Sequence, residues 1–188
     1  IGSHHSGICL ACNPIFKELK TIGFPNGSAT SITGAKGHPY VFRMNESVLH
    51  EVTSASDWAI RQGKKWTLLG LDYAWGQDQC NQWAKKVESL GGKALDKIMV
   101  PLGTDNLVPY LSRINVKETE VVFMAFFSGS AIAFAKQAKN MGIFDKFKYV
   151  GTYDSVDGLD PKPFEGSFFH TPFPQRSDQV PAPLKSYD

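Results

Sequence analysis

Short apolar runs alternate with segments of helical periodicity along most of the chain. The runs predict strands at residues 66–71, 94–100, 121–127, 148–152 and 166–171. Strands that alternate with helices are typical of βαβ units. The pattern therefore predicts an α/β fold with a largely parallel sheet.

The segments between these strands carry apolar side chains at helical spacing. One helix is predicted from the stripe Cys80, Trp83, Ala84, Val87 and Leu90. It is expected to end at the glycine pair 91–92. A second stripe, Leu107, Tyr110, Leu111 and Ile114, follows an N-cap expected at Asp105 or Asn106. A third helix is predicted near residues 130–141.

The first 62 residues predict helices near 8–20 and 47–62, and short strands at 21–24 and 40–44. A Gly/Ser/Thr-rich loop, 26–37, lies between the two strands. The polar stretch 61–65 contains a glycine and is the expected boundary between two lobes. Two or three strands are few for a closed lobe, so we expect residues 1–62 to complete a sheet with strands outside this sequence.

Composition and charge exclude several classes of protein. The 188 residues are 42% hydrophobic and 20% charged, which is typical of a globular chain rather than a disordered one. A net charge of +2, with basic and acidic residues interspersed, argues against nucleic-acid binding. No apolar run approaches the roughly 20 residues that cross a bilayer. Three cysteines are too few for a disulfide framework.

Several segments, in order, carry a resemblance to a known family. They are 40–43 (YVFR), 66–76 (WTLLGLDYAWG), 90–92 (LGG), 100–105 (VPLGTD), and 135–139 (AKQAK) with 141–142 (MG). Together they resemble type I periplasmic substrate-binding proteins, above all those of ABC transporters for branched-chain amino acids, amides and related solutes.

The resemblance implies a two-lobed fold with doubly wound parallel sheets, of which this chain is the central portion. Residues 1–62 would form part of an incomplete N-terminal lobe and residues 63–174 the C-terminal lobe. Residues 175–188 would be a loop or the start of the return segment.

The implied function is capture of a small polar solute, such as an amino acid or amide, between the lobes, and delivery to an ABC transporter permease. Hinge closure would accompany binding. The resemblance implies no enzyme activity and no cofactor. It implies a periplasmic or extracellular location, with a lipid anchor conceivable in a segment outside this sequence.

A zwitterionic solute needs donors for its carboxylate, an acid for its ammonium group and apolar walls. Ser6, at the start of the first predicted helix, is a candidate hydroxyl donor. The resemblance implies that Ser28, Ala29 and Thr30 contact the carboxylate and ammonium groups. As alternatives, Ser6 could cap its helix and Thr30 could stabilise its own loop.

In the second lobe, the resemblance implies that Trp75 closes over the solute. Phe127 and Tyr153 lie where strands end, the edge at which open α/β sheets bind ligands. Asp154, beside Tyr153, is the candidate counter-charge for the ammonium group. The alternatives are core aromatic residues for Trp75 and Phe127, and a turn residue for Asp154.

Two other functions remain open at this point. His4, His5, Cys9 and Cys12 have residue types that bind zinc or carry redox chemistry, although the cysteines also fit small buried side chains on an amphipathic helix. The same fold also serves cytoplasmic ligand sensors and receptor ectodomains, because a fold does not decide function.

Overall fold

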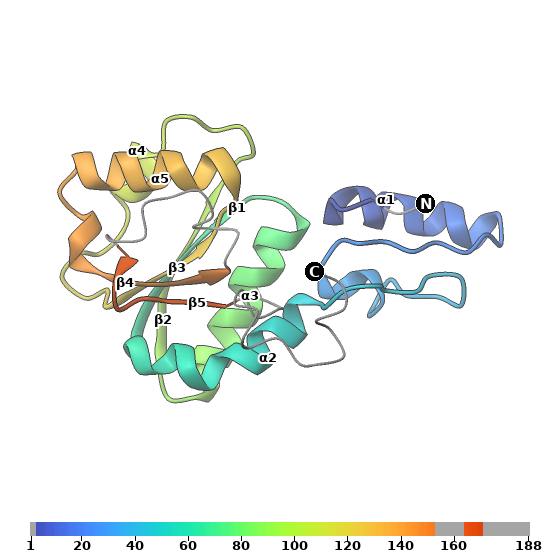
Figure 1. The fold of residues 1–188 in the computed structure, drawn as a ribbon, viewed down its shortest axis with the longest axis horizontal. Helices are drawn as coiled ribbons and strands as arrows, with labels where there is room; N and C mark the ends of the chain where they lie inside the picture. The colour runs from blue at the N-terminus through green and yellow to red at the C-terminus, as the bar shows by residue number, and fades with distance from the viewer. Residues whose placement is uncertain (1–2, 153–163, 171–188) are drawn as a thin grey trace, which may run out of the picture.

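The computed structural model describes residues 3–152 and 164–170, which form two bodies of unequal size (Figure 1). The larger body is a helix-covered sheet. Its strands are β1 (Lys65–Leu71), β2 (Lys93–Val100), β3 (Val121–Ala125), β4 (Lys148–Thr152) and β5 (Phe168–His170). The smaller body comes from the first part of the chain.

All neighbouring strands in the sheet are parallel, in the order β2-β1-β3-β4-β5. Every residue of β3 is buried, and so is every residue of β1 after Lys65. Continuous apolar strands of this kind are typical of a parallel sheet covered on both faces. The α/β fold and the parallel sheet predicted from the sequence are confirmed.

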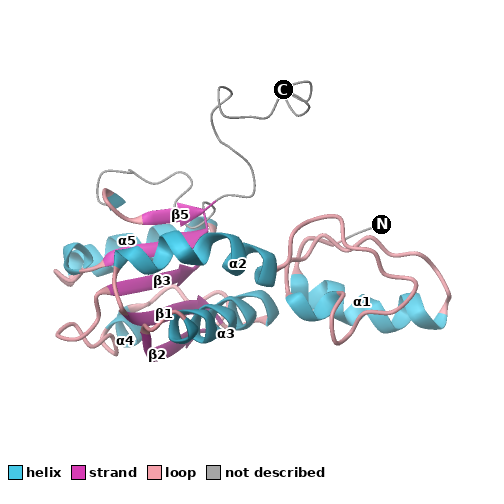
Figure 2. Cartoon of the chain, turned by 90° about the horizontal axis from the view of Figure 1, so that it is seen from below, coloured by secondary structure: helices cyan, strands magenta, loops and turns pink. Residues whose placement is uncertain are grey.

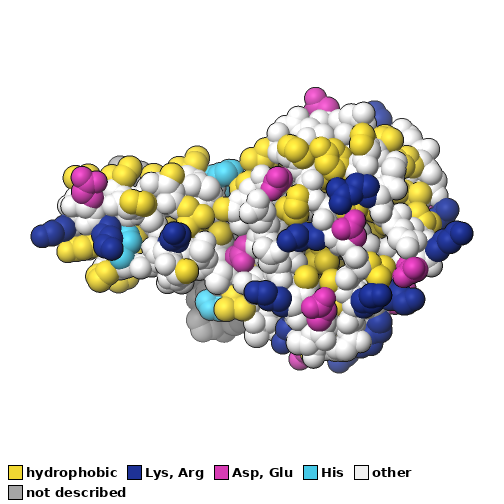
Figure 3. All heavy atoms as spheres, turned by 180° about the vertical axis from the view of Figure 1, so that it is seen from behind, with side chains coloured by type: hydrophobic (Ala, Val, Ile, Leu, Met, Phe, Trp, Pro, Cys, Tyr) yellow, Lys and Arg dark blue, Asp and Glu magenta, His cyan; other side chains and the backbone are white. Residues whose placement is uncertain are grey.

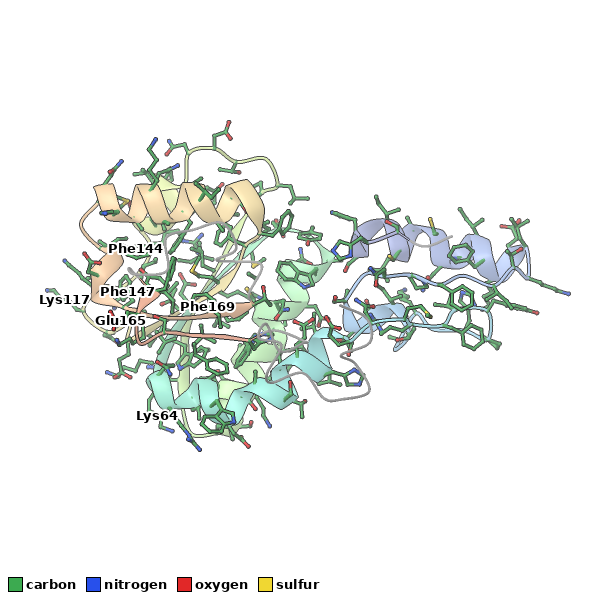
Figure 4. All side chains as sticks on the ribbon, in the orientation of Figure 1. Lys64, Lys117, Phe144, Phe147, Glu165 and Phe169 are labelled. Atoms are coloured by element: carbon green, nitrogen blue, oxygen red, sulfur yellow. The ribbon has the colours of Figure 1, made fainter. Side chains whose placement is uncertain are left out.

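Helices cover both faces of the sheet. On one face, α2 (Val48–Ala59) and α3 (Ala74–Ser89) pack on a core in which the rings of Trp66 and Trp83 stack at 5.6 Å. On the other face lie α4 (Val108–Leu111) and α5 (Ser128–Asn140). The apolar core of this second face extends to Phe144 and Phe147, at the end of the larger body away from the smaller one (Figure 4).

The helix expected over residues 107–114 is a single turn, α4. Its second residue is Pro109, which has no N–H to donate. The predicted apolar stripe is nevertheless used, because Leu107, Leu111 and Ile114 are all buried. The end of α3 is as predicted: Leu90 caps the helix and Gly91 follows with φ of +77°.

The smaller body consists of α1 (Ser6–Glu18), the short 3₁₀ helix η1 (Thr30–Ile32) and loops (Figure 2). Its small core is formed by Cys9, Ala29, Ile32 and Val41. The strands predicted at 21–24 and 40–44 are wrong: these segments share one isolated parallel bridge, Gly23 with Val41. Two short segments with no further strand beside them among the described residues cannot sustain a regular ladder.

Apolar side chains therefore remain exposed on the smaller body, as the yellow atoms in Figure 3 show. They come from α1 and from the two bridging segments: Ile8, Ile15, Leu19, Ile22, Phe24, Phe42 and Met44. Such a surface fits a lobe whose sheet is completed by other strands.

The position of α2 bears on the boundary between the lobes. Val48, Val52, Ala55 and Ala59 all belong to the core that β1 and α3 form. The helix therefore packs as part of the larger body, although residues 47–62 were expected in the first lobe. We propose that the lobes divide before α2 rather than at residues 61–65.

A polar cluster is buried between α2, α3 and β5. Gln79 donates from Nε2 to Oε2 of Glu51 at 2.5 Å, and the rings of Trp83 and His170 lie 6.3 Å apart. The Nε2 atom of His170 has no hydrogen-bond partner among the described residues. Burial lowers the pKa of His170 to about 4.

This environment predicts a pH-dependent stability. Between pH 6.5 and about 4 the unfolded chain binds a proton at His170 that the folded chain does not, so acidification favours unfolding. Over that window the free energy of unfolding should fall by up to about 3 kcal/mol through this group. Urea unfolding at several pH values should show a flatter profile for His170→Phe, whereas His4→Gln, at an exposed position, should leave the profile unchanged. Equal slopes in all three proteins would contradict the prediction.

Gly76 allows the first turn of α3 to approach the end of β1. A methyl group there would overlap the carbonyl oxygen of Leu71, whereas one at Gly129 in α5 would meet no atom within 4 Å. Gly76→Ala should lower the free energy of unfolding by about 1–3 kcal/mol or more, and Gly129→Ala should not lower it. Chemical denaturation measures both, and a Gly76→Ala protein as stable as the wild type would show that the contact is not tight.

Candidate ligand-binding site

The two bodies meet beyond the carboxyl ends of β1 and β3. In a sheet of order 2-1-3-4-5 the switch point lies between these two strands, because the helices that follow them cover opposite faces. The chain leaves β1 toward Tyr73, the N-cap of α3, and leaves β3 toward Phe127, the N-cap of α5. Side chains from these helix starts therefore line the junction.

Four rings form an aromatic cluster there: His5, Tyr73, Trp75 and Phe127. His5, from the smaller body, stacks on Tyr73 with ring centroids 4.6 Å apart. Phe127 makes edge-to-face contacts with Tyr73 at 6.2 Å and with Trp75 at 6.1 Å. Burial raises the pKa of Tyr73, so its hydroxyl keeps its proton. The cluster joins both bodies through apolar ring surfaces.

Three hydroxyl groups of the smaller body accept hydrogen bonds from protein donors. Ser6 Oγ accepts from Ala29 N at 3.1 Å, and Ser28 Oγ from the Asn45 amide at 3.2 Å. Thr30 Oγ1 accepts from Leu49 N, also at 3.2 Å. In these hydrogen bonds each hydroxyl oxygen is the acceptor, which leaves its proton for another partner. Ser28 and Thr30 are partly exposed and can offer theirs to a solute, whereas Ser6 is buried.

Arg43 holds the loop that carries two of these hydroxyls. Its guanidinium group donates to the carbonyl oxygens of Gly27 at 2.5 Å and Ala29 at 2.7 Å, and to Thr33 Oγ1 at 3.0 Å. Burial lowers its pKa from the usual value, but an arginine stays charged at neutral pH. No salt bridge to Arg43 occurs among residues 3–152 and 164–170. The carboxylates of Asp78, Glu46 and Glu51 interact with its charge without forming a salt bridge and balance it in part.

Asp78, on the second turn of α3, links the two bodies directly. Its Oδ2 atom accepts from Thr30 N at 2.6 Å, while Oδ1 accepts from the Gln82 amide at 3.2 Å. The sequence analysis missed Asp78 because its partner is 48 positions away. Its one sequence signal is the three-residue spacing from Trp75, which places both residues on one face of a helix.

The structure gathers most of the predicted site residues at this junction. Ser6, Ala29 and Thr30 are connected through the Ser6–Ala29 hydrogen bond and the chain itself, and Trp75 and Phe127 lie in the aromatic cluster. Ala29 is buried, and its backbone N–H and carbonyl oxygen already pair with Ser6 Oγ and Arg43, so it supports the loop rather than offering a contact to a solute. Tyr153 and Asp154 lie outside the described residues.

The position of Ser6 differs from the prediction in one respect. The helix begins at Ser6 rather than near residue 8, and its N-cap is His5. The Ser6 hydroxyl does not cap α1; it accepts from Ala29 N on the neighbouring loop. The loop-stabilising alternative for Thr30 is also met in part, because its hydroxyl accepts from the start of α2.

The four candidate metal or redox residues do not converge. The Cys9 thiol donates to the Ser3 carbonyl oxygen at 2.9 Å, His4 pairs with Asn26, and His5 stacks on Tyr73. Within the described part of the chain, no group of three or more His, Cys, Asp or Glu side chains could hold a metal ion. The geometry thus gives this alternative no support.

Comparison with known proteins identifies the family. The family model described as "Periplasmic binding protein" matches residues 1–184, and the chain belongs to this family. A curated relative, Leu/Ile/Val-binding protein homolog 6 of Brucella melitensis, is 27% identical over 144 residues. That match covers 76% of this chain and 37% of the relative.

Solved structures share the fold. A solute-binding protein of an ABC transporter from Rhodopseudomonas palustris BisB5, in complex with 3,4-dihydroxybenzoic acid, has a TM-score of 0.78 and 22% identity, covering 99% of this chain and 52% of its own. A branched-chain amino acid ABC transporter protein from Thermus thermophilus with bound valine has a TM-score of 0.73 and 21% identity, with coverages of 89% and 44%. This chain spans about half the length of these structures.

No helix in the described residues is long and apolar enough to cross a membrane.

The hydrogen bonds of Arg43 predict that a lysine cannot replace it. Arg43→Lys removes the planar group that reaches two carbonyl oxygens at once, and should lower the free energy of unfolding by about 1–3 kcal/mol. Arg113→Lys is the matched control, because Arg113 is about half exposed and makes one 3.5 Å ion pair. Denaturation curves with the same midpoint for both variants would contradict the role given to Arg43.

Proposed function

We propose that the whole protein is an extracytoplasmic solute-binding protein that captures a small polar solute between two lobes and delivers it to an ABC transporter permease. One observation carries the proposal: Thr30 N bonds to Asp78 on α3 and His5 stacks on Tyr73, so the hydroxyl-bearing loop and the aromatic wall meet at the switch point of the sheet. Binding sites of open α/β sheets form at such a point.

The relatives support a solute of amino-acid or similar size. The Brucella relative is named for leucine, isoleucine and valine, and the Thermus structure contains valine. The Rhodopseudomonas structure contains a dihydroxybenzoic acid. All of these molecules carry a carboxylate beside an apolar group, the combination that hydroxyl donors and ring surfaces can receive.

In this proposal each predicted residue has a role. Ser28 and Thr30 donate hydroxyl protons to the solute carboxylate, and the buried Ser6 hydroxyl holds Ala29, and with it that loop, in place. Trp75 and Phe127 form the apolar wall. Tyr153 and Asp154 follow β4 in the sequence, and Asp154 would balance an ammonium group on an amino-acid solute.

The proposed chemistry is binding and release rather than a reaction. No covalent step is required of any side chain at the junction, and closure of two lobes on a solute is a hinge transition. The corresponding location is the periplasm or the cell exterior, where a permease receives its solutes.

A thermal-shift screen of the full-length protein tests this function. A solute that binds only the folded state raises the unfolding midpoint, so at least one member of a panel of amino acids, amides and small carboxylates should raise it by several degrees. Thr30→Val keeps the side-chain shape but lacks the hydroxyl, and should lower affinity for that solute about fivefold to tenfold.

Thr53→Val, on the exposed side of α2, is the matched control and should bind as the wild type does. A midpoint that responds to zinc alone, or to no member of the panel, would refute the proposed function.

A further inference from the structure

We infer that the solute is an aromatic carboxylate, a molecule in which a carboxylate group is attached to or near an aromatic ring; this inference rests on the proposed function. The observation behind it is that the protein places one of its own rings and one of its own carboxylates at the junction. His5 covers a face of Tyr73, and Asp78 accepts the hydrogen bond of Thr30 N.

The solute ring would stack on the face of Tyr73 beside Trp75 and Phe127, a surface that we call the ring seat. All three rings follow the ends of β1 and β3, and Phe127 braces the other two by edge-to-face contacts. Aromatic surfaces prefer another ring over an aliphatic chain when a stacked or edge contact is available. The contact that the seat makes in this structure is of this kind, with His5 at 4.6 Å and an interplanar angle of 30°.

His5 is a poor occupant of that seat. Its Nδ1 atom is buried and has no hydrogen-bond partner among the described residues. A buried polar atom without a partner costs free energy, whereas a benzene-like ring carries no such atom. Exchange of His5 for a solute ring therefore keeps the stacking and returns the imidazole to water.

The carboxylate seat is the loop of residues 28–30. Thr30 N already donates to a carboxylate oxygen at 2.6 Å, so the seat accepts this chemical group. The hydroxyls of Ser28 and Thr30 have protons to offer, and the charge of Arg43 lies behind the loop. When a solute carboxylate replaces Asp78 as the acceptor of the Thr30 N–H, Asp78 keeps its second hydrogen bond, which it accepts from Gln82.

In each body the two seats belong to neighbouring segments, and we place one small solute across both. On the smaller body, His5 precedes Ser6, whose hydroxyl is bonded to Ala29 beside Thr30. On the larger body, Trp75 and Asp78 lie one turn apart on α3. An aliphatic amino acid would fill the carboxylate seat but gain little at the rings.

Calorimetric titration of the full-length protein tests the inference with matched pairs of probes. Benzoate should bind at least tenfold tighter than cyclohexanecarboxylate, and phenylalanine at least tenfold tighter than leucine, because only the aromatic member stacks. Benzamide, which lacks the charge, should bind at least tenfold more weakly than benzoate.

Variants test each seat separately. Tyr73→Leu should weaken benzoate binding about tenfold, and Tyr73→Phe, which keeps the ring, should weaken it less. Asp78→Asn removes the competing charge and should tighten benzoate binding about threefold to fivefold. Asp57→Asn, at an exposed position of α2, should leave the affinity unchanged.

The outcomes separate this inference from the function on which it rests. Leucine or valine binding as tightly as the aromatic acids would overturn the aromatic solute and leave solute binding intact. Unchanged or weaker benzoate binding by Asp78→Asn would overturn the exchange at Thr30 N. Failure of every small solute to bind would remove the proposed function and the inference together.

Discussion

The parallel pairing of β1 with β3 is the constraint on which the arrangement of the site depends. Both strands are buried on their two faces, so a shift in register would disrupt the close packing of side chains on both faces at once. Their carboxyl ends are therefore fixed side by side, and with them the starts of α3 and α5. Tyr73, Trp75 and Phe127 meet because the sheet places the starts of these two helices at one point.

The polar half of the site depends on a different principle, the directionality of hydroxyl groups. A hydroxyl that accepts from a backbone or side-chain N–H is held in one orientation and turns its own proton elsewhere. Ser6, Ser28 and Thr30 share this arrangement, although their donors come from different segments. On the other side of the same loop, Arg43 donates to the carbonyl oxygens of Gly27 and Ala29. The loop therefore accepts hydrogen bonds from Arg43 on one side and can donate hydroxyl protons on the other.

The sequence was sufficient for the larger body because its signals are local. Buried strands are visible in the sequence as apolar runs. Gly91 marks the end of α3 because it has a positive φ, a backbone conformation that few other residues adopt. The run at 121–127 was predicted two residues too long, since Phe126 and Phe127 continue the apolar pattern beyond the last strand pair. The strands predicted at 21–24 and 40–44 form only one bridge, because a strand needs neighbouring strands to pair with and none lies beside them among the described residues.

For the candidate site, the sequence suggested Ser6, Thr30, Trp75 and Phe127 but not the residues that contact them. His5 was considered only as a metal ligand, Arg43 and Tyr73 only as parts of the segments that carry the resemblance, and Asp78 not at all. Bonds between residues as far apart as Thr30 and Asp78 leave no trace in local spacing.

The attachment of the loop has a mechanical consequence. Ser28 O and Thr30 Oγ1 accept from Val48 N and Leu49 N, the first turn of a helix that belongs to the larger body. Rotation of the smaller body about this attachment would move the loop of residues 28–30 little and the far end of α1 much more, because displacement grows with distance from the axis.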